Sequence, residues 1–289
     1  MIIVNDLHKT FVRQGKVNTK NITDIARLLG LMKKKNEVVN AVNGVSFTAQ
    51  DGAITGLLGA NGAGKTTTLR MVAALLNPDR GDITVDGIKV QAGVSSTQSQ
   101  MGVLSDARGL YPRLTARENI HYYGLLHGMS AEQAAQRTEQ LSHWLEMGAL
   151  LDRRTDGFSQ GERMKTALAR ALVHDPKNII LDEPTNGLDV VATRALREFL
   201  RWLRSAEGGG KCIIFSTHIM QEVERLCDDV VIVAQGKNVA RGTVAGLLQQ
   251  AEENNFEDAF VKLAFLQTEN VTINVTINVT TNMTMGARG

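Results

Sequence analysis

The most constraining feature of this sequence is a glycine-rich loop that joins an apolar segment to a segment with helical spacing. Residues 59–66 read Gly-Ala-Asn-Gly-Ala-Gly-Lys-Thr and match the pattern G-x-x-x-x-G-K-[ST]. Residues 53–58 are apolar almost throughout, as in a strand buried on both faces. A helix is expected from Gly64 to about Leu76. This strand–loop–helix context favours a phosphate-binding loop over a chance glycine-rich turn.

The residue types of this loop indicate a role for each polar side chain. Glycines let the backbone wrap closely, so that N–H groups and the positive end of the helix dipole converge on phosphate oxygens. Lys65 is predicted to reach the β- and γ-phosphates, Thr66 to offer a hydroxyl to Mg²⁺, and Thr67 to reach the α-phosphate. The remaining predicted nucleotide-binding positions of the loop are Gly59, Asn61, Gly62 and Gly64.

A second apolar segment, 178–181, ends in two carboxylates. Beside a phosphate loop, Asp182 suits the coordination shell of Mg²⁺. Glu183 suits the attacking water, either as general base or as the acceptor that orients it. The alternative is a solvated strand end. Alone, the acidic pair is a weak signal for a catalytic site, and the phosphate loop in the same chain makes it a strong one.

Strand and helix patterns alternate along the chain and predict an α/β fold with a mainly parallel sheet. Thr115 and Glu118 form a capping box at the start of a helical block that reaches residue 173. The other expected strands are 2–7, 42–49, 82–85, 102–104, 178–181, 212–216 and 230–234, and the other expected helices are 190–205 and 219–226.

Bulk properties exclude several classes of protein. The net charge of +2 produces no strong field toward nucleic acid. The two cysteines show neither metal-ligand spacing nor a disulfide framework, which indicates a reducing compartment. No apolar run is long enough to span a bilayer, and the first residues do not read as a secretory signal. A role in transport would therefore require a membrane partner.

Two segments read as additions to the core. Residues 16–36 are basic, and their apolar positions predict an amphipathic helix near 23–34. It would contact a permease or anionic lipid, or pack as a solvated helix on its own domain. Residues 270–285 repeat a four-residue N-x-T unit, and this tail is expected to be dispensable.

Three short stretches and one aromatic residue outside the loop carry a family resemblance. Residues 158–162, Phe-Ser-Gln-Gly-Glu, resemble the signature of ABC ATPases, usually written L-S-G-G-Q. Residues 186–189, Asn-Gly-Leu-Asp, resemble the D-loop, and residues 216–218, Ser-Thr-His, end a strand as the switch histidine of that family does. Phe11 lies where the family places an aromatic residue against adenine. In order and spacing, residues 1 to about 260 resemble ATP-binding subunits of ABC transporters.

Two stretches narrow the resemblance within that family. Residues 109–120 and 158–165 are similar to the subunits that partner ABC-2-type permeases, and most to the NatA-like sodium-efflux ATPases. The resemblance implies an ATP-binding and ATP-hydrolysing exporter subunit, peripheral at the cytoplasmic face of the cell membrane. Its implied partners are an ABC-2-type integral membrane permease and a second ATPase subunit, as a homodimer, and no nucleic acid.

The resemblance also implies a fold and a domain plan. The fold is α/β, with a P-loop NTPase (RecA-like) core around a parallel sheet, an N-terminal antiparallel β subdomain and an inserted helical signature subdomain. The expected ATPase domain is 1–255, with the helical subdomain at about 107–173 and the basic insert at about 16–36. A C-terminal extension, 256–269, and the repeat tail, 270–289, would follow.

The implied cofactors are ATP and Mg²⁺, and the implied catalytic residues are Lys65, Glu183 and His218. Two ATP molecules would lie between the phosphate loop of one subunit and the signature of the other. There Ser159 and the backbone of Gly161 would bind the γ-phosphate of the opposite nucleotide, and Asp189 of the D-loop would contribute to nucleotide binding. His218 would contact the γ-phosphate; without the other motifs it reads as a buried strand-end histidine.

Two other functions are alternatives for an ABC ATPase. A soluble ABC ATPase acting on ribosomes or nucleic acid is one alternative, but the chain has one phosphate loop, no coiled-coil pattern and near-neutral charge. A regulatory subunit without turnover is the other, and the presence of both Lys65 and Glu183 argues against it. The exporter subunit is therefore favoured.

The sequence departs from the family pattern at three positions. Gln160 replaces the first signature glycine, and Glu162 replaces the final glutamine. Asp106 stands where the Q-loop glutamine is expected, and a carboxylate oxygen there would suit Mg²⁺, which prefers oxygen ligands. The alternative is a solvated turn residue with no metal contact.

If Asp106 replaces the glutamine oxygen as a metal ligand, Asp106→Ala should weaken Mg²⁺-dependent ATP hydrolysis and Asp106→Gln should retain most of it. The measurement is the ATPase rate against Mg²⁺ concentration for both variants. Parental rates for both at limiting Mg²⁺ would place Asp106 away from the metal.

Overall fold

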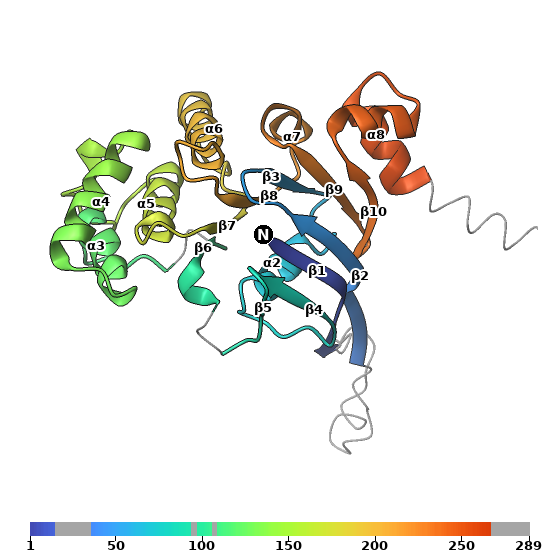
Figure 1. The fold of residues 1–289 in the computed structure, drawn as a ribbon, viewed down its shortest axis with the longest axis horizontal. Coiled ribbons are helices and arrows are strands. Elements are labelled where there is room, and N and C mark those ends of the chain that lie inside the picture. The colour runs from blue at the N-terminus through green and yellow to red at the C-terminus, as the bar shows by residue number, and fades with distance from the viewer. Residues whose placement is uncertain (15–35, 94–96, 106–108, 267–289) are drawn as a thin grey trace, which may run out of the picture.

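The computed structural model describes residues 1–14, 36–93, 97–105 and 109–266 as two sheets with flanking helices (Figure 1). The strands are β1 (Ile2–Gln14), β2 (Asn36–Ala49), β3 (Ile54–Leu58), β4 (Arg80–Val85), β5 (Ile88–Lys89), β6 (Met101–Leu104), β7 (Asn178–Asp182), β8 (Cys212–Thr217), β9 (Asp229–Ala234) and β10 (Lys237–Gly242). The helices are α2 (Lys65–Val72), α3 (Ala116–Leu126), α4 (Ala131–Trp144), α5 (Gln160–Leu172), α6 (Val190–Arg204), α7 (Met220–Leu226), α8 (Val244–Ala251) and α9 (Phe256–Val261). Short helical turns are η2 (Gln98–Gln100), η3 (Gly148–Leu150) and η4 (Lys262–Leu266).

The two sheets differ in strand direction. The first has the order β2-β1-β4-β5 and is antiparallel. The second has the order β10-β9-β3-β8-β7-β6 and is parallel except for β10. Helices α3, α4 and α5 lie together at one end of the molecule and α8 at the other (Figure 1). This arrangement confirms the predicted fold class, an α/β P-loop NTPase with an N-terminal antiparallel sheet.

Strands β7 and β8 carry apolar side chains on both faces, and these pack into two hydrophobic cores. Ile179 and Ile213 face the core shared with α3, α5 and α6, whereas Ile180 and Ile214 face the core shared with α2 and the antiparallel sheet. Neighbouring side chains of a strand point to opposite faces, so both must be apolar when both faces are covered. This packing explains why these strands read as continuous apolar runs.

Local signals set the helix starts, and backbone conformation sets one helix end. The predicted capping box is confirmed at α3, where the side chain of Thr115 accepts a hydrogen bond from the N–H of Glu118. The prediction that the helix after Gly64 runs to about Leu76 is wrong, because α2 ends at Val72 and Ala74 has φ 57°. A residue in the left-handed backbone conformation cannot continue a right-handed helix.

Several sequence predictions lie outside the described residues: the basic insert from residue 16 to 35, Asp106, and the repeat tail. The first strand is longer than predicted, because β1 pairs with β2 from Ile2 opposite Ala49 to Gln14 opposite Asn36. Within the described ranges, no helix is long and apolar enough to cross a membrane.

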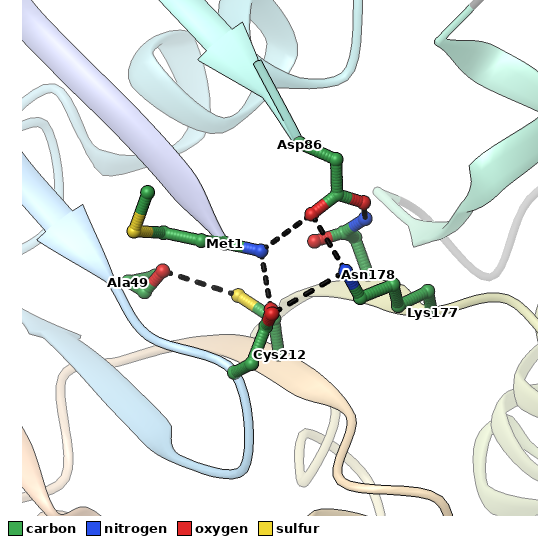
Figure 2. Close-up of polar contacts among 7 residues, drawn as sticks. Met1, Ala49, Asp86, Lys177, Asn178 and Cys212 are labelled. Atoms are coloured by element: carbon green, nitrogen blue, oxygen red, sulfur yellow. Dashed lines mark hydrogen bonds and ion pairs between the residues drawn. The ribbon is translucent and has the colours of Figure 1, made fainter. Parts of the chain in front are cut away.

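A charged cluster joins the two sheets at the amino ends of β7 and β8 (Figure 2). Asp86, in the turn after β4, accepts hydrogen bonds from Lys177 Nζ and Asn178 Nδ2, each at 2.9 Å, and from the amino group of Met1 at 2.7 Å. Burial raises the pKa of Asp86, but these donors outweigh it and lower the pKa to about 2 from the ordinary 3.8. The cluster therefore stabilises the fold through an ionised carboxylate.

Asp86→Asn should lower the free energy of unfolding at neutral pH by roughly 1–2 kcal/mol, after allowance for partial exposure. Because the folded-state pKa lies below the unfolded one, the parental contribution is present above about pH 4 and is lost as the pH falls toward about pH 2. Urea unfolding of the parent and of Asp86→Asn across this pH range measures the difference in free energy of unfolding. Asp156→Asn, at an exposed residue, is the control. A difference that does not shrink in acid would show that the Asp86 charge is not its source.

Candidate functional site

Three buried strands deliver the candidate site residues to one edge of the parallel sheet. Strand β3 leads into the loop at Gly59, β7 into Glu183, and β8 into His218. The register pairs Leu58 with Thr217 and Asp182 with Ser216, so the three carboxyl ends lie side by side. In open parallel sheets, ligands bind outside these ends.

The loop between β3 and α2 requires glycine where it meets other backbone. Gly64 has φ 106°, and a methyl group on it would lie 2.4 Å from the carbonyl oxygen of Ala41. No side chain caps the helix there, and its first internal bond runs from Thr68 N–H to Gly64 O. The N–H groups of the first turn are thus free of helical acceptors, as an anion site requires.

The loop borders a cavity of about 350 Å³. Its walls come from the glycine-rich loop, from β2, from the β9–β10 turn and from the end of β7. The lining residues are Val39, Asn40, Ala41, Asn61, Gly62, Gly64, Lys65, Thr66, Thr67, Glu183, Gln235 and Gly236. The structure therefore brings most of the predicted phosphate-loop residues and Glu183 to one hollow.

The amino group of Lys65 is buried inside this loop. Its side chain is 4% exposed, and Nζ donates to the carbonyl oxygens of Gly59 at 2.7 Å and Ala60 at 3.2 Å. The same Nζ lies 3.5 Å from Oε1 of Glu183. A buried cation needs such oxygen partners. They hold the amino group of Lys65 near the N-terminus of α2, where the helix dipole is positive.

Glu183 has a distinct contact for each carboxylate oxygen. Oε2 accepts a hydrogen bond from Asn186 Nδ2 at 2.5 Å, and Oε1 lies 3.3 Å from Nδ1 of His218. The residue has φ 50°, and its N–H donates to both the carbonyl and the hydroxyl oxygen of Ser216. This left-handed backbone turns the chain sharply after β7 and aims the carboxylate at the loop.

These neighbours set the charge state of Glu183. Burial raises the pKa of its carboxyl group, but the hydrogen bond from Asn186, the imidazole of His218 and the charge of Lys65 outweigh burial. The pKa of Glu183 is therefore lower than usual, and the group is an ionised acceptor at neutral pH. An ionised carboxylate beside a phosphate loop can accept a hydrogen bond from water and orient it.

Asp182 and Thr66 are the two described residues that are predicted to bind metal. The only potential metal ligands in their side chains are oxygen atoms. The Oδ1 atom of Asp182 accepts a hydrogen bond from the hydroxyl of Ser216 at 2.5 Å, which fixes the carboxylate at the strand end. Thr66 lies in the first turn of α2 and lines the cavity. Carboxylate and hydroxyl oxygens suit the chemistry of Mg²⁺.

The signature residues lie elsewhere in the described structure. Ser159 caps α5, and its hydroxyl accepts from the N–H of Glu162 at 3.2 Å. Gly161 follows in the first turn, and Asp189 caps α6 by accepting from Ala192 N–H at 2.8 Å. Ser159, Gly161 and Asp189 do not line the cavity beside the phosphate loop.

Glu162, which departs from the family signature, has partners within its own subunit. Its Oε2 atom accepts a hydrogen bond from the N–H of Ser159 at 2.8 Å and completes the capping box of α5. Its Oε1 atom accepts from Nη1 of Arg153, also at 2.8 Å. The carboxylate therefore stabilises the start of the helix that carries the signature.

Phe11 also lies outside the cavity lining, although it is close to it. In β1 it pairs with Val39 of β2, which does line the cavity, and its side chain is 42% exposed. The predicted adenine-stacking role therefore stays a prediction.

Sequence reasoning missed several residues that shape the site. Asn186 belongs to the D-loop stretch, yet its contact with Glu183 has no signal in the sequence. The β9–β10 turn was also missed, although Gly236 donates to Ala63 O at 2.9 Å and accepts from Asn43 N–H at 2.7 Å. A Gln-Gly pair between two strand patterns was the available signal for this turn.

Comparisons with known proteins agree with this geometry. The protein-family profile described as "ABC transporter" matches residues 42–186. The chain is 42% identical over 241 residues to "ABC transporter ATP-binding protein NatA" of Bacillus subtilis (strain 168), covering 83% of this chain and 96% of that protein. It is 40% identical over 208 residues to "Nod factor export ATP-binding protein I" of Burkholderia lata, covering 72% of this chain and 67% of that protein.

Solved structures show the same fold. "Structure of ATP binding subunit of ABC transporter" aligns with a TM-score of 0.74 and 27% identity, over 91% of this chain and 99% of the other. The dimeric structure of a bacterial ABC transporter cassette aligns with a TM-score of 0.70 and 22% identity, over 84% of this chain and 98% of the other. The second likeness, at that identity, concerns the fold alone.

Proposed function

Since this chain belongs to the ABC transporter family as an ATP-binding subunit, we propose that it hydrolyses ATP with Glu183 and thereby drives a separate ABC-2-type permease. The observation that carries this proposal is the position of Glu183, which lines the phosphate-loop cavity together with Lys65 and lies 3.3 Å from Nδ1 of His218. The same geometry supports turnover over a purely regulatory role, because both the cation and the acceptor are in place.

Each residue has a role that follows from its position. The free N–H groups of α2 and the Lys65 amino group bind the phosphates of ATP. Glu183 orients the attacking water and accepts its proton, while Asn186 fixes one oxygen of that carboxylate. His218 lies beside the other oxygen and contacts the γ-phosphate in the proposed complex.

Thr66 and Asp182 would hold Mg²⁺, which when bound neutralises charge that develops on the phosphate oxygens. Ser216 supports this arrangement because its hydroxyl donates to Asp182 and accepts from the N–H of Glu183. The side chain of Ser216 thus contacts both Asp182, the proposed metal ligand, and Glu183, the proposed water-orienting residue.

A second copy of the chain completes the site in this proposal. Ser159 and Gly161 lie at the N-terminus of α5, outside the cavity of their own subunit, and would bind the γ-phosphate held by the partner. The proposed ATPase domain is 1–255, with the helical subdomain at about 107–173. The proposed place of the chain is the cytoplasmic face of the membrane, bound to the permease.

Glu183→Gln should lower the ATPase rate by about 10²–10⁴-fold, because an amide cannot accept the proton of the attacking water. Binding of ATP should persist, so the variant should accumulate as an ATP-bound dimer that gel filtration detects. Exposed Glu224→Gln in α7 is the matched control and should hydrolyse ATP like the parent. Turnover within about threefold of the parent would place the catalytic carboxylate elsewhere.

Sodium is the proposed substrate of the permease, on the likeness to NatA and to the sodium-efflux group. Inside-out proteoliposomes that hold the permease and this chain should accumulate radioactive sodium when ATP is added. The same vesicles with Glu183→Gln should not accumulate it. Permease-stimulated ATP hydrolysis without sodium uptake would reject sodium and leave the ATPase proposal standing.

A further inference from the structure

The side chain of Gln160, at the start of α5, packs against the backbone of Gly187 in the turn that leads to α6. A methyl group on residue 187 would lie 2.5 Å from both Cγ and Cδ of Gln160, so the glutamine stem leaves no room for a β-carbon there. Gly187 also has φ 81°, which favours glycine. The neighbouring Gly161 packs there too, since a methyl group on it would lie 3.0 Å from Gly187 O.

The turn that receives Gln160 is the one that holds Glu183. Backbone hydrogen bonds run from Asn186 N–H to Glu183 O at 3.2 Å and from Leu188 N–H to Thr185 O at 3.1 Å. The side chain of Asn186, next to Gly187, donates to Oε2 of Glu183 at 2.5 Å. A shift of Gly187 would therefore move Asn186 relative to the carboxylate.

We propose that Gln160 is a positioning residue that acts through Gly187 and Asn186 on Glu183 of the same subunit. This inference rests on the proposed function, because it assigns Glu183 to the attacking water. It also gives a role to a residue that departs from the family signature. The segment expected to meet the partner's nucleotide is packed against the turn that orients the carboxylate of its own subunit.

The contact works by shape rather than by charge. Gln160 Nε2 lies 2.9 Å from the same β-carbon position, so the whole end of the side chain lies over the glycine. A glycine at this position, as in the usual family signature, would leave that space open. Both residues are exposed, so truncation at Cβ would likewise remove this surface contact beside residue 187 and let the turn relax. A side chain with the same stem length would restore it.

Gln160→Ala should lower the kcat for ATP hydrolysis by about 3- to 30-fold, because small displacements of a water-orienting group are costly. The dissociation constant for ATP, measured on isolated subunits, should change less than about twofold, since Gln160 does not line the cavity. Gln160→Met keeps the stem and should restore most of the rate. The matched control is Gln136→Ala on the exposed face of α4, which should leave kcat unchanged.

A double-mutant cycle with Asn186→Ala tests the route of the effect. If Gln160 acts through Asn186, then Gln160→Ala should lower kcat by less than about twofold when Asn186 is already alanine. Additive losses would overturn the proposed route. A parental kcat for Gln160→Ala would overturn the proposal at once.

Mixed dimers decide whether Gln160 acts on its own subunit. With Gln160→Ala and Glu183→Gln on one subunit, the remaining Glu183 has its own Gln160, so the rate should equal that of the parent paired with Glu183→Gln. With the two changes on opposite subunits, the rate should fall by the full effect of Gln160→Ala. The reverse pattern would place the effect on the partner's nucleotide. If Glu183→Gln itself turned over normally, the proposed function would fail first.

Discussion

Parallel hydrogen bonding between β3, β8 and β7 fixes which residues lie side by side at the edge of the sheet. Leu58 is opposite Thr217, and Asp182 is opposite Ser216, so the loop, the acidic pair and His218 begin at the same level. The register is held by the cores on both faces of the sheet. A one-residue slip of β7 would exchange Ile179 and Ile180 between the two cores. The geometry of the site therefore follows from the packing beneath it.

At the carboxyl edge of the parallel sheet, the charges of Lys65 and Glu183 compensate each other. Lys65 is nearly fully buried, and the loop carbonyl oxygens hold its amino group near Glu183. Asn186 donates to one carboxylate oxygen of Glu183, and His218 and Lys65 lie near the other, so the pKa of Glu183 is lower than usual despite partial burial. Removing one partner would leave the other with an uncompensated charge, a change that costs more than the loss of an exposed ion pair.

Short local patterns were predictable from the sequence, and contacts between distant residues were not. The phosphate loop and the acidic end of β7 each depend on a few consecutive residues whose chemistry is visible in their order. Strand β1 extends beyond Leu7 because β2 pairs with it as far as Gln14 and β4 at His8, and its polar residues show no alternating pattern there. Helices α8 and α9 pack on the core of β9 and β10, which no local signal indicates. The aim of Glu183 depends on a left-handed backbone that glutamate rarely adopts.

Strand β7 is restrained at both of its ends. Asn178 is held by Asp86 at the start, and Ser216 holds Asp182 and Glu183 at the finish, only five residues later. A strand this short, hydrogen-bonded to a neighbouring strand on each side, cannot stretch appreciably along its length. A displacement at the carboxyl ends of the sheet would therefore be taken up in the turn after Glu183, which leads into α6, rather than by stretching β7.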